Sequence, residues 1–157
     1  MQSGDETLVE REPSHWLSLE ALTDRLKEFF HARHEAVIVY LYGSFLKRSE
    51  WHDVDVAVLL DPQRVAQGFD LLRYGLQVGA ELEQFLGRPR VSIDLRVLND
   101  APLVFQNEVI KTGVPIVVRD EQTRIAYEAK VLIEFLDFLP VLEMYERALF
   151  REIRQWS

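Results

Sequence analysis

The chain has 157 residues, 48% of them hydrophobic, with a formal net charge of −8 and no cysteine. This length predicts one domain with a sizeable core, and the lack of cysteine excludes disulfides and thiolate chemistry. No apolar run reaches the roughly 18 residues that a membrane span requires. The negative charge argues against a long nucleic-acid substrate, because phosphate binding depends on basic side chains. We expect a cytoplasmic protein with a flexible tail at residues 1–14 and a single domain at residues 15–157.

The first half of the chain predicts one helix and two strands. Leucine and phenylalanine recur at helical spacing from Leu19 to His31, and Ser18 can cap the start of this helix. Two apolar runs rich in β-branched residues follow, at Val37–Tyr42 and Asp53–Leu60, and they predict buried strands. A polar connection joins these two strands.

The second half predicts two helices that alternate with two strands, followed by a long helical region. These elements are a helix at Phe69–Leu86 that ends at Gly87, a strand at Val91–Leu98, a helix at Pro102–Thr112 and a strand at Val114–Val118. Pro115 favours the edge of the sheet for the last strand. Asp120 can cap the final helical region, which extends to about Gln155 and which we expect Pro140 to interrupt. The fold class is therefore α/β (α+β), with a small mixed sheet of about four strands and helices packed against it.

Three carboxylates on the predicted strands form a candidate metal site. Asp53 and Asp55 lie two residues apart, so both side chains point to the same face of a strand. Asp94 lies on the polar face of a later strand, where Arg96 can form an ion pair with it. If the two strands are neighbours, the carboxylates converge, and their repulsion raises their pKa values unless a cation lies between them. Mg²⁺ prefers such oxygen ligands, so we predict that the three aspartates bind Mg²⁺ and are catalytic.

The pair Gly43-Ser44 follows the first strand and is a candidate phosphate-binding turn. Glycine allows a phosphate to approach the backbone, and consecutive N–H groups can form an anion-binding nest. The hydroxyl of Ser44 can donate a further hydrogen bond, and Lys47 and Arg48 lie in the same connection. We therefore predict that Gly43, Ser44, Lys47 and Arg48 bind a nucleotide.

Together these residues resemble the DNA polymerase β-type nucleotidyltransferase superfamily, in particular its minimal prokaryotic members. The superfamily motif h-G-S followed by D-h-D-h corresponds to Tyr42-Gly43-Ser44 and Asp53-Val54-Asp55-Val56, and Asp94 corresponds to the third carboxylate. The segment from Ala101 to Phe138 is also similar to the MntA-like antitoxins paired with HEPN-domain toxins, and the resemblance as a whole covers about residues 36–145. The connection from Gly-Ser to D-x-D has eight residues, which is short for the superfamily, and Lys47-Arg48-Ser49 stands where Arg-Gly is common.

The resemblance implies a polymerase β-type fold and a magnesium-dependent nucleotidyltransferase. Asp53 and Asp55 would hold the metal bound to the ATP triphosphate, and Asp94 would help to deprotonate an acceptor hydroxyl. The antitoxin likeness implies that AMP is transferred from ATP to a tyrosine of a cognate HEPN-family RNase toxin. Two alternatives remain open: a small-molecule nucleotidyltransferase of the aminoglycoside type, which the acidic composition suits, and a catalytically degenerate antitoxin that acts by binding only.

Two further expectations concern the acceptor. The sequence shows no evident walls for a second small molecule, which favours a protein that brings its own surface. The leucines and phenylalanines between Val131 and Phe150 can present an apolar helical face to such a partner.

Overall fold

The described part of the chain forms four helices and four strands in the order predicted from its sequence. The structure is a computed structural model that describes residues 18–43, 46, 53–87 and 91–155, so the predicted tail at residues 1–14 lies outside the described residues. In chain order the elements are α1 (Leu19–His31), β1 (Ala36–Tyr42), β2 (Asp53–Leu60), α2 (Leu71–Leu86), β3 (Ser92–Val97), α3 (Leu103–Thr112), β4 (Val114–Val118) and α4 (Glu121–Gln155). Helix α2 begins two residues later than expected because the Asp70 side chain caps it, accepting a hydrogen bond from the backbone N–H of Arg73 at 2.9 Å.

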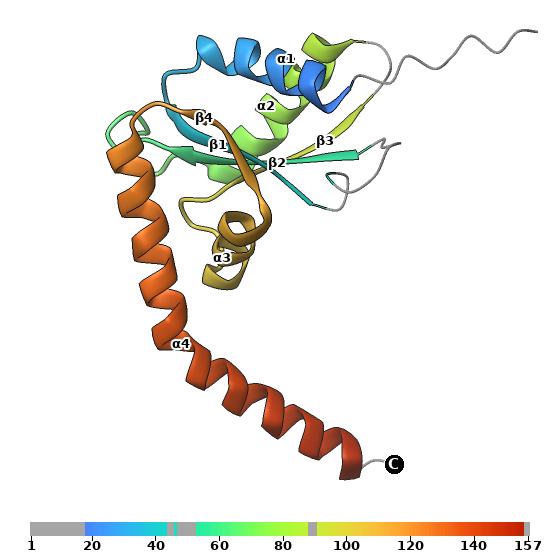
Figure 1. Ribbon diagram of the computed structural model, residues 1–157, viewed down its shortest axis with the longest axis vertical. Coiled ribbons are helices and arrows are strands. Elements are labelled where there is room, and N and C mark those ends of the chain that lie inside the picture. Colours follow the sequence, from blue (N-terminus) through green and yellow to red (C-terminus); the bar gives the residue numbers. More distant parts are fainter. Residues whose placement is uncertain (1–17, 44–45, 47–52, 88–90, 156–157) are drawn as a thin grey trace, which may run out of the picture.

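The four strands form one mixed sheet in the order β3-β2-β1-β4. Strand β1 pairs antiparallel with both β2 and β4, whereas β2 and β3 run parallel. Helices α1 and α2 cover one face of the sheet, and α3 lies on the other (Figure 1). Strand β4, which contains Pro115, lies at an edge as predicted. The mixed sheet of four strands with helices packed against it is the α/β (α+β) architecture that the sequence predicts, and a long C-terminal helix follows it.

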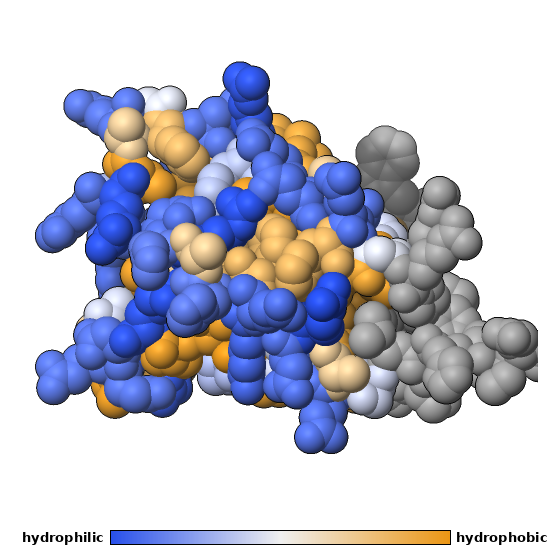
Figure 2. Space-filling model, turned by 90° about the horizontal axis from the view of Figure 1, so that it is seen from above, coloured by the Kyte–Doolittle hydropathy of each residue, from blue (hydrophilic) through white to orange (hydrophobic). Residues whose placement is uncertain are grey.

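Alternation along the strands divides the core between the two faces of the sheet. The buried residues of β1 that belong to the core on the α1–α2 side are Ala36, Val39 and Leu41, and those on the α3 side are Ile38, Tyr40 and Tyr42. Seen from the α1–α2 side, the surface has an apolar area surrounded by hydrophilic side chains (Figure 2).

Helix α2 approaches β3 closely at two glycines. A Cβ on Gly75 would lie 2.8 Å from the backbone oxygen of Leu95, whereas one on Gly79 would meet its nearest atom, Cβ of Leu95, at 3.5 Å. Both glycines are buried. The pair therefore allows close packing of α2 on the sheet, and Gly75 makes the tighter approach.

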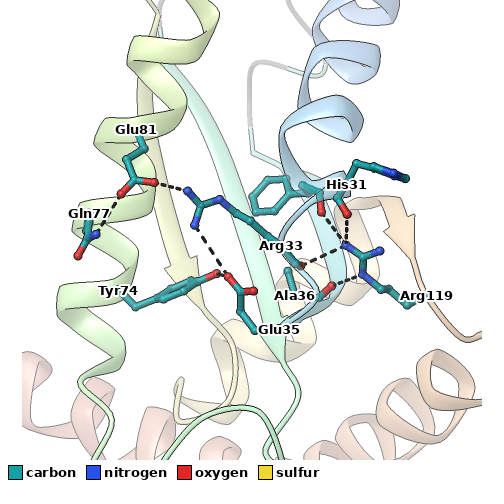
Figure 3. Close-up of polar contacts among 9 residues, drawn as sticks. His31, Arg33, Glu35, Ala36, Tyr74, Gln77, Glu81 and Arg119 are labelled. Carbon is teal, nitrogen blue, oxygen red and sulfur yellow. Dashed lines mark hydrogen bonds and ion pairs between the residues drawn. The ribbon is translucent and has the colours of Figure 1, made fainter.

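One arginine ties β4 to the end of α1 (Figure 3). The guanidinium of Arg119 donates from Nη2 to the backbone oxygens of Phe30, His31 and Arg33 and from Nε to that of Ala36, over distances of 2.6–3.3 Å. The last carbonyls of a helix have no partner within the helix, so this side chain satisfies the end of α1. Because Arg119 comes two residues before α4, the same bonds also hold the start of α4 near the end of α1.

Helix α4 is continuous, and the predicted interruption at Pro140 is wrong. Helical residues run from Glu121 to Gln155 with Pro140 inside. Proline removes one N–H donor and crowds the preceding turn, which a helix can absorb by bending. Figure 1 shows α4 changing direction near its middle and its second half extending away from the sheet. Among the described residues, no helix combines the length and hydropathy needed to cross a membrane.

Candidate active site

Asp55 and Asp94 lie directly opposite each other on neighbouring parallel strands. The β2–β3 register pairs Asp55 with Asp94 and Asp53 with Ser92. Paired residues of adjacent strands point to the same face of a sheet, and Asp53 shares the face of Asp55 because it precedes it by two residues. The structure therefore brings the three predicted aspartates together at the end of the sheet where β2 and β3 begin (Figure 1).

The electrostatics of Asp55 show that the three carboxylates influence one another. Burial raises the pKa of Asp55 above its usual value, and the negative charges of Asp94 and Asp53 raise it further. The positive charge of Arg96 opposes this effect. The Arg96 guanidinium lies 3.2 Å from the Asp94 carboxylate, which confirms the ion pair predicted between these side chains. Among the described residues, the three carboxylates of the cluster outnumber the one cation that contacts them, Arg96.

Gly43 connects the end of β1 to this cluster. Its φ is +100°, a left-handed conformation that side chains disfavour. A Cβ at this position would overlap the Oδ2 atom of Asp55. Glycine is therefore required both by the turn and by the carboxylate beside it. The other residues predicted to bind nucleotide, Ser44, Lys47 and Arg48, lie outside the described part of the chain.

Two aromatic side chains beside the carboxylates were not identified from the sequence. Tyr42 is paired with Asp55 across β1 and β2, and its ring packs edge-on against Phe105 of α3 at 5.6 Å. Burial and the charges of Asp55 and Asp94 raise the pKa of Tyr42. The guanidinium of Arg96 lies 5.4 Å from the centre of the Phe105 ring. Tyr42 could have been identified from the sequence as a site residue, because it immediately precedes Gly43. Phe105 could not, because only the fold places it beside Tyr42.

A cavity of about 460 Å³ opens beside Asp94. Its walls come from the first turns of α2, the edge of β3 and the start of α3. The lining residues are Leu71, Leu72, Gly75, Leu76, Asp94, Leu95, Arg96, Val97, Asp100, Ala101, Pro102 and Phe105. Sequence analysis did not identify this cavity, because its lining residues come from three separate elements that only the fold brings together.

The donor chemistry of the three aspartates fits a hard divalent cation. Mg²⁺ binds oxygen ligands, and a cation would relieve the repulsion that raises the pKa of Asp55. Among the residues that the structure describes, no three Asp, Glu, His or Cys side chains stand in a ready-made metal-binding arrangement. The Asp94 carboxylate contacts Arg96 through Oδ2, and a carboxylate has a second oxygen that can join Asp53 and Asp55 as a ligand.

Solved structures with this fold include toxin–antitoxin complexes. One is the tri-AMPylated HEPN toxin of Shewanella oneidensis in complex with MNT antitoxin; the matching chain is 16% identical with a TM-score of 0.62, and the match covers 85% of this chain and 97% of that one. A toxin–antitoxin structure with AMP-PNP matches at 16% identity and a TM-score of 0.62, over 83% and 97%. The toxin–antitoxin MntA-HepT matches at 16% identity and a TM-score of 0.60, over 85% and 97%. At these identities the likeness establishes the fold.

Sequence comparison assigns the family. A search of curated proteins found no match. The family model described as Polymerase beta, Nucleotidyltransferase matches residues 24–122, which is more than half of the chain and includes Gly43, Asp53, Asp55 and Asp94. The chain therefore belongs to the polymerase beta nucleotidyltransferase family.

Proposed function

We propose that the protein is a magnesium-dependent antitoxin that transfers AMP from ATP to a tyrosine hydroxyl of a cognate HEPN-family RNase toxin. The observation that carries this proposal is the position of Asp55 opposite Asp94, with Asp53 on the same face, in a chain of the nucleotidyltransferase family. Two of the similar structures, a tri-AMPylated HEPN toxin with MNT antitoxin and a toxin–antitoxin with AMP-PNP, support the choice of acceptor and donor.

The nucleotide half of the site would extend from the end of β1 to the start of β2. Gly43 and Ser44 would approach the phosphates, with Lys47 and Arg48 adding positive charge. Asp53 and Asp55 would hold Mg²⁺ together with the triphosphate, and Asp94 would complete the ligand set. When bound, Mg²⁺ supplies the positive charge that neutralises the phosphates during the displacement.

The acceptor half of the site would use Asp94 as a proton acceptor. The tyrosine oxygen attacks the α-phosphorus of ATP in line, so a new P–O bond forms as the bond from the α-phosphorus to the bridging oxygen breaks. Pyrophosphate leaves with the bonding electrons, and the phenolic proton passes to the Asp94 carboxylate. Positioning and charge neutralisation supply most of the acceleration in such transfers. The added AMP brings bulk and negative charge to the toxin, which would repel RNA from a nearby RNase site.

The distal part of α4 supports a protein as the partner. Every residue from 143 to 154 is exposed. The large apolar side chains of α4 beyond Pro140 that are at least 49% exposed are Val141, Met144, Tyr145, Leu149, Phe150 and Ile153. An accumulation of apolar surface of this kind is typical of a protein interface. An amphipathic helix laid against a partner is a common recognition mode.

The test is a transfer assay with the purified protein, Mg²⁺, labelled ATP and the HEPN-domain toxin encoded beside it. We expect the toxin mass to increase by one or more AMP units, the label to map to tyrosine, and Asp53→Ala to abolish transfer. Asp24→Ala on the exposed side of α1 is the control for a lost carboxylate and should transfer AMP normally.

Two other outcomes would favour the alternatives. Labelling of aminoglycosides without labelling of the toxin would identify a small-molecule nucleotidyltransferase, which the net charge of −8 favours because these substrates are polycations. A stable toxin complex without any transfer would identify an antitoxin that acts by binding only.

A further inference from the structure

The cavity beside Asp94 is lined by apolar side chains of two helices and by a carboxylate of β3. Leu72 and Leu76 of α2 line it and are 75% and 69% exposed, although leucine is usually buried. Pro102 and Phe105 of α3 also line it. Asp94 places a carboxylate at the cavity, and this carboxylate also belongs to the candidate catalytic cluster. The cavity therefore combines apolar walls with a reactive carboxylate.

The two exposed leucines are not needed for the core of α2. The buried residues of this helix are Gly75, Val78, Gly79, Leu82 and Leu86. Leu72 and Leu76 are four residues apart and therefore share one helical face, and this face borders the cavity rather than the sheet. Packing of α2 does not account for leucine at these positions, whereas a ligand that covers them would.

Gly75 forms the part of the cavity wall where α2 meets β3. Its missing side chain lets the backbone of α2 approach the backbone oxygen of Leu95, and Gly75 itself lines the cavity. The volume of about 460 Å³ falls in the range of roughly 300–1,000 Å³ that is usual for ligand pockets. The cavity is large enough for an aromatic side chain together with part of its backbone.

We propose that this cavity is the acceptor site and that it binds the phenol side chain of a tyrosine presented by a protein. This inference rests on the proposed function and adds the binding site of the acceptor. An aromatic ring buries both faces against apolar walls and carries one hydroxyl at its tip. Leu72, Leu76 and Phe105 supply such walls, and Asp94 can accept the hydrogen bond and then the proton of the hydroxyl.

The same lining disfavours a sugar acceptor. An aminoglycoside needs many hydrogen-bonding partners for its hydroxyl and ammonium groups, and a buried polar group without a partner is costly. The polar side chains that line the cavity are Asp94, Arg96 and Asp100, of which Arg96 already pairs with Asp94. A tyrosine places one polar atom in the cavity, and the carboxylate of Asp94 can satisfy it.

The test measures binding of N-acetyl-tyrosinamide by NMR, using leucine methyl signals of the full-length protein. We expect the signals of Leu72 and Leu76 to shift, and Leu76→Glu to weaken binding by at least about tenfold. Leu76→Met should retain binding within about twofold, because methionine preserves the apolar volume. Leu19→Glu, which changes an exposed leucine on α1, is the matched control and should bind normally.

Two results would overturn the inference: shifts confined to other leucines, or equal binding by Leu76→Glu and the wild type. A further measurement separates this inference from the proposed function. Leu76→Glu should raise KM for the toxin while Mg²⁺·AMP-PNP binds with unchanged affinity. If the wild type binds N-acetyl-tyrosinamide at the cavity but transfers AMP to no protein, the proposed function fails and the binding site stands.

Discussion

The carboxylate of Asp55 occupies the space that a side chain on Gly43 would need. The two residues face each other across the end of β1 and the start of β2, and the φ of +100° at Gly43 adds a second constraint. The Gly-Ser turn and the D-x-D strand are therefore coupled sterically, so a change in one displaces the other.

Gly43→Ala should be strongly destabilising. We expect the free energy of unfolding in urea to fall by about 2–4 kcal/mol, because the new Cβ is strained at positive φ and overlaps Asp55. In an Asp55→Ala background the cost should fall to about 1–2 kcal/mol, since the overlap with Oδ2 and Cγ is gone and the backbone strain remains with one close contact to Cβ. A double-mutant cycle measures this difference, and an equal cost in both backgrounds would contradict the steric coupling.

Mg²⁺ with AMP-PNP should stabilise the protein. A ligand at a hundredfold excess over its Kd raises the free energy of unfolding by about 2.7 kcal/mol, which thermal or urea unfolding can detect. Asp55→Asn should remove the dependence on Mg²⁺ and leave the fold intact, because it removes a carboxylate whose charge Asp94 and Asp53 oppose. The control Asp24→Asn should respond as the wild type does. Lack of stabilisation by any nucleotide would argue against an active enzyme.

The two glycines of α2 should respond differently to alanine. Gly75→Ala should lower the free energy of unfolding by about 1–3 kcal/mol, because its Cβ would lie 2.8 Å from the backbone oxygen of Leu95. Gly79→Ala would make only ordinary contacts, the nearest at 3.5 Å. It should therefore be neutral, or stabilising by up to about 1 kcal/mol through the higher helix propensity of alanine. An equal loss of unfolding free energy in both variants would contradict the packing of α2 on β3 described above.

Stability should fall steeply above pH 10. Burial is the main cause of raised pKa values at four tyrosines, Tyr40, Tyr42, Tyr74 and Tyr127, and at Tyr74 a hydrogen bond to Glu35 also contributes. Above the ordinary value of 10 these phenols lose their protons in the unfolded chain but keep them in the folded one. The folded state then binds more protons, so the free energy of unfolding decreases as the pH rises.

Tyr74→Phe tests this dependence. Removing one such phenol should reduce the slope above pH 10 by about 1.4 kcal/mol per pH unit. Tyr145→Phe changes a tyrosine of α4 that is 77% exposed and serves as the control with an unchanged slope. Urea unfolding at several pH values between about 9 and 12 measures both variants.

A charge introduced on the distal part of α4 should weaken binding of the proposed protein partner and leave nucleotide binding unchanged. Leu149 is 57% exposed, so Leu149→Glu should change the free energy of unfolding by no more than about 0.5 kcal/mol. Stabilisation by Mg²⁺ and AMP-PNP should also be unchanged. Transfer of AMP to the toxin should drop by at least about tenfold, because the charge interrupts an apolar interface. Normal transfer by this variant would place the partner elsewhere.

The elements and their order were predictable from the sequence because each has a strong local signal. Ser18, Asp120 and Gly87 cap their helices as predicted. Alternation along the strands correctly assigned Asp53, Asp55 and Asp94 to polar faces. Whether Asp55 and Asp94 lie next to each other depends on the strand order, which local patterns do not give. In the structure the parallel pairing of β2 with β3 places them opposite each other.

Other features depend on contacts between distant segments, which local patterns do not encode. The four carbonyls bound by Arg119 come from residues more than 80 positions earlier in the chain. The difference between Gly75 and Gly79 depends on which atom of Leu95 lies opposite each of them. At Pro140 the local rule predicted a break, but a helix with exposed sides can bend and continue.

The bend of α4 gives the chain two parts that natural selection can change separately. Side chains beyond Pro140 are exposed along residues 143–154, whereas the carboxylates lie at the far end of β2 and β3. Substitutions in the distal helix therefore leave the sheet and its aspartates untouched. If the distal helix binds the proposed partner and the aspartates carry the proposed reaction, a lineage can exchange one partner for another by changes confined to this helix while the reaction is inherited unaltered.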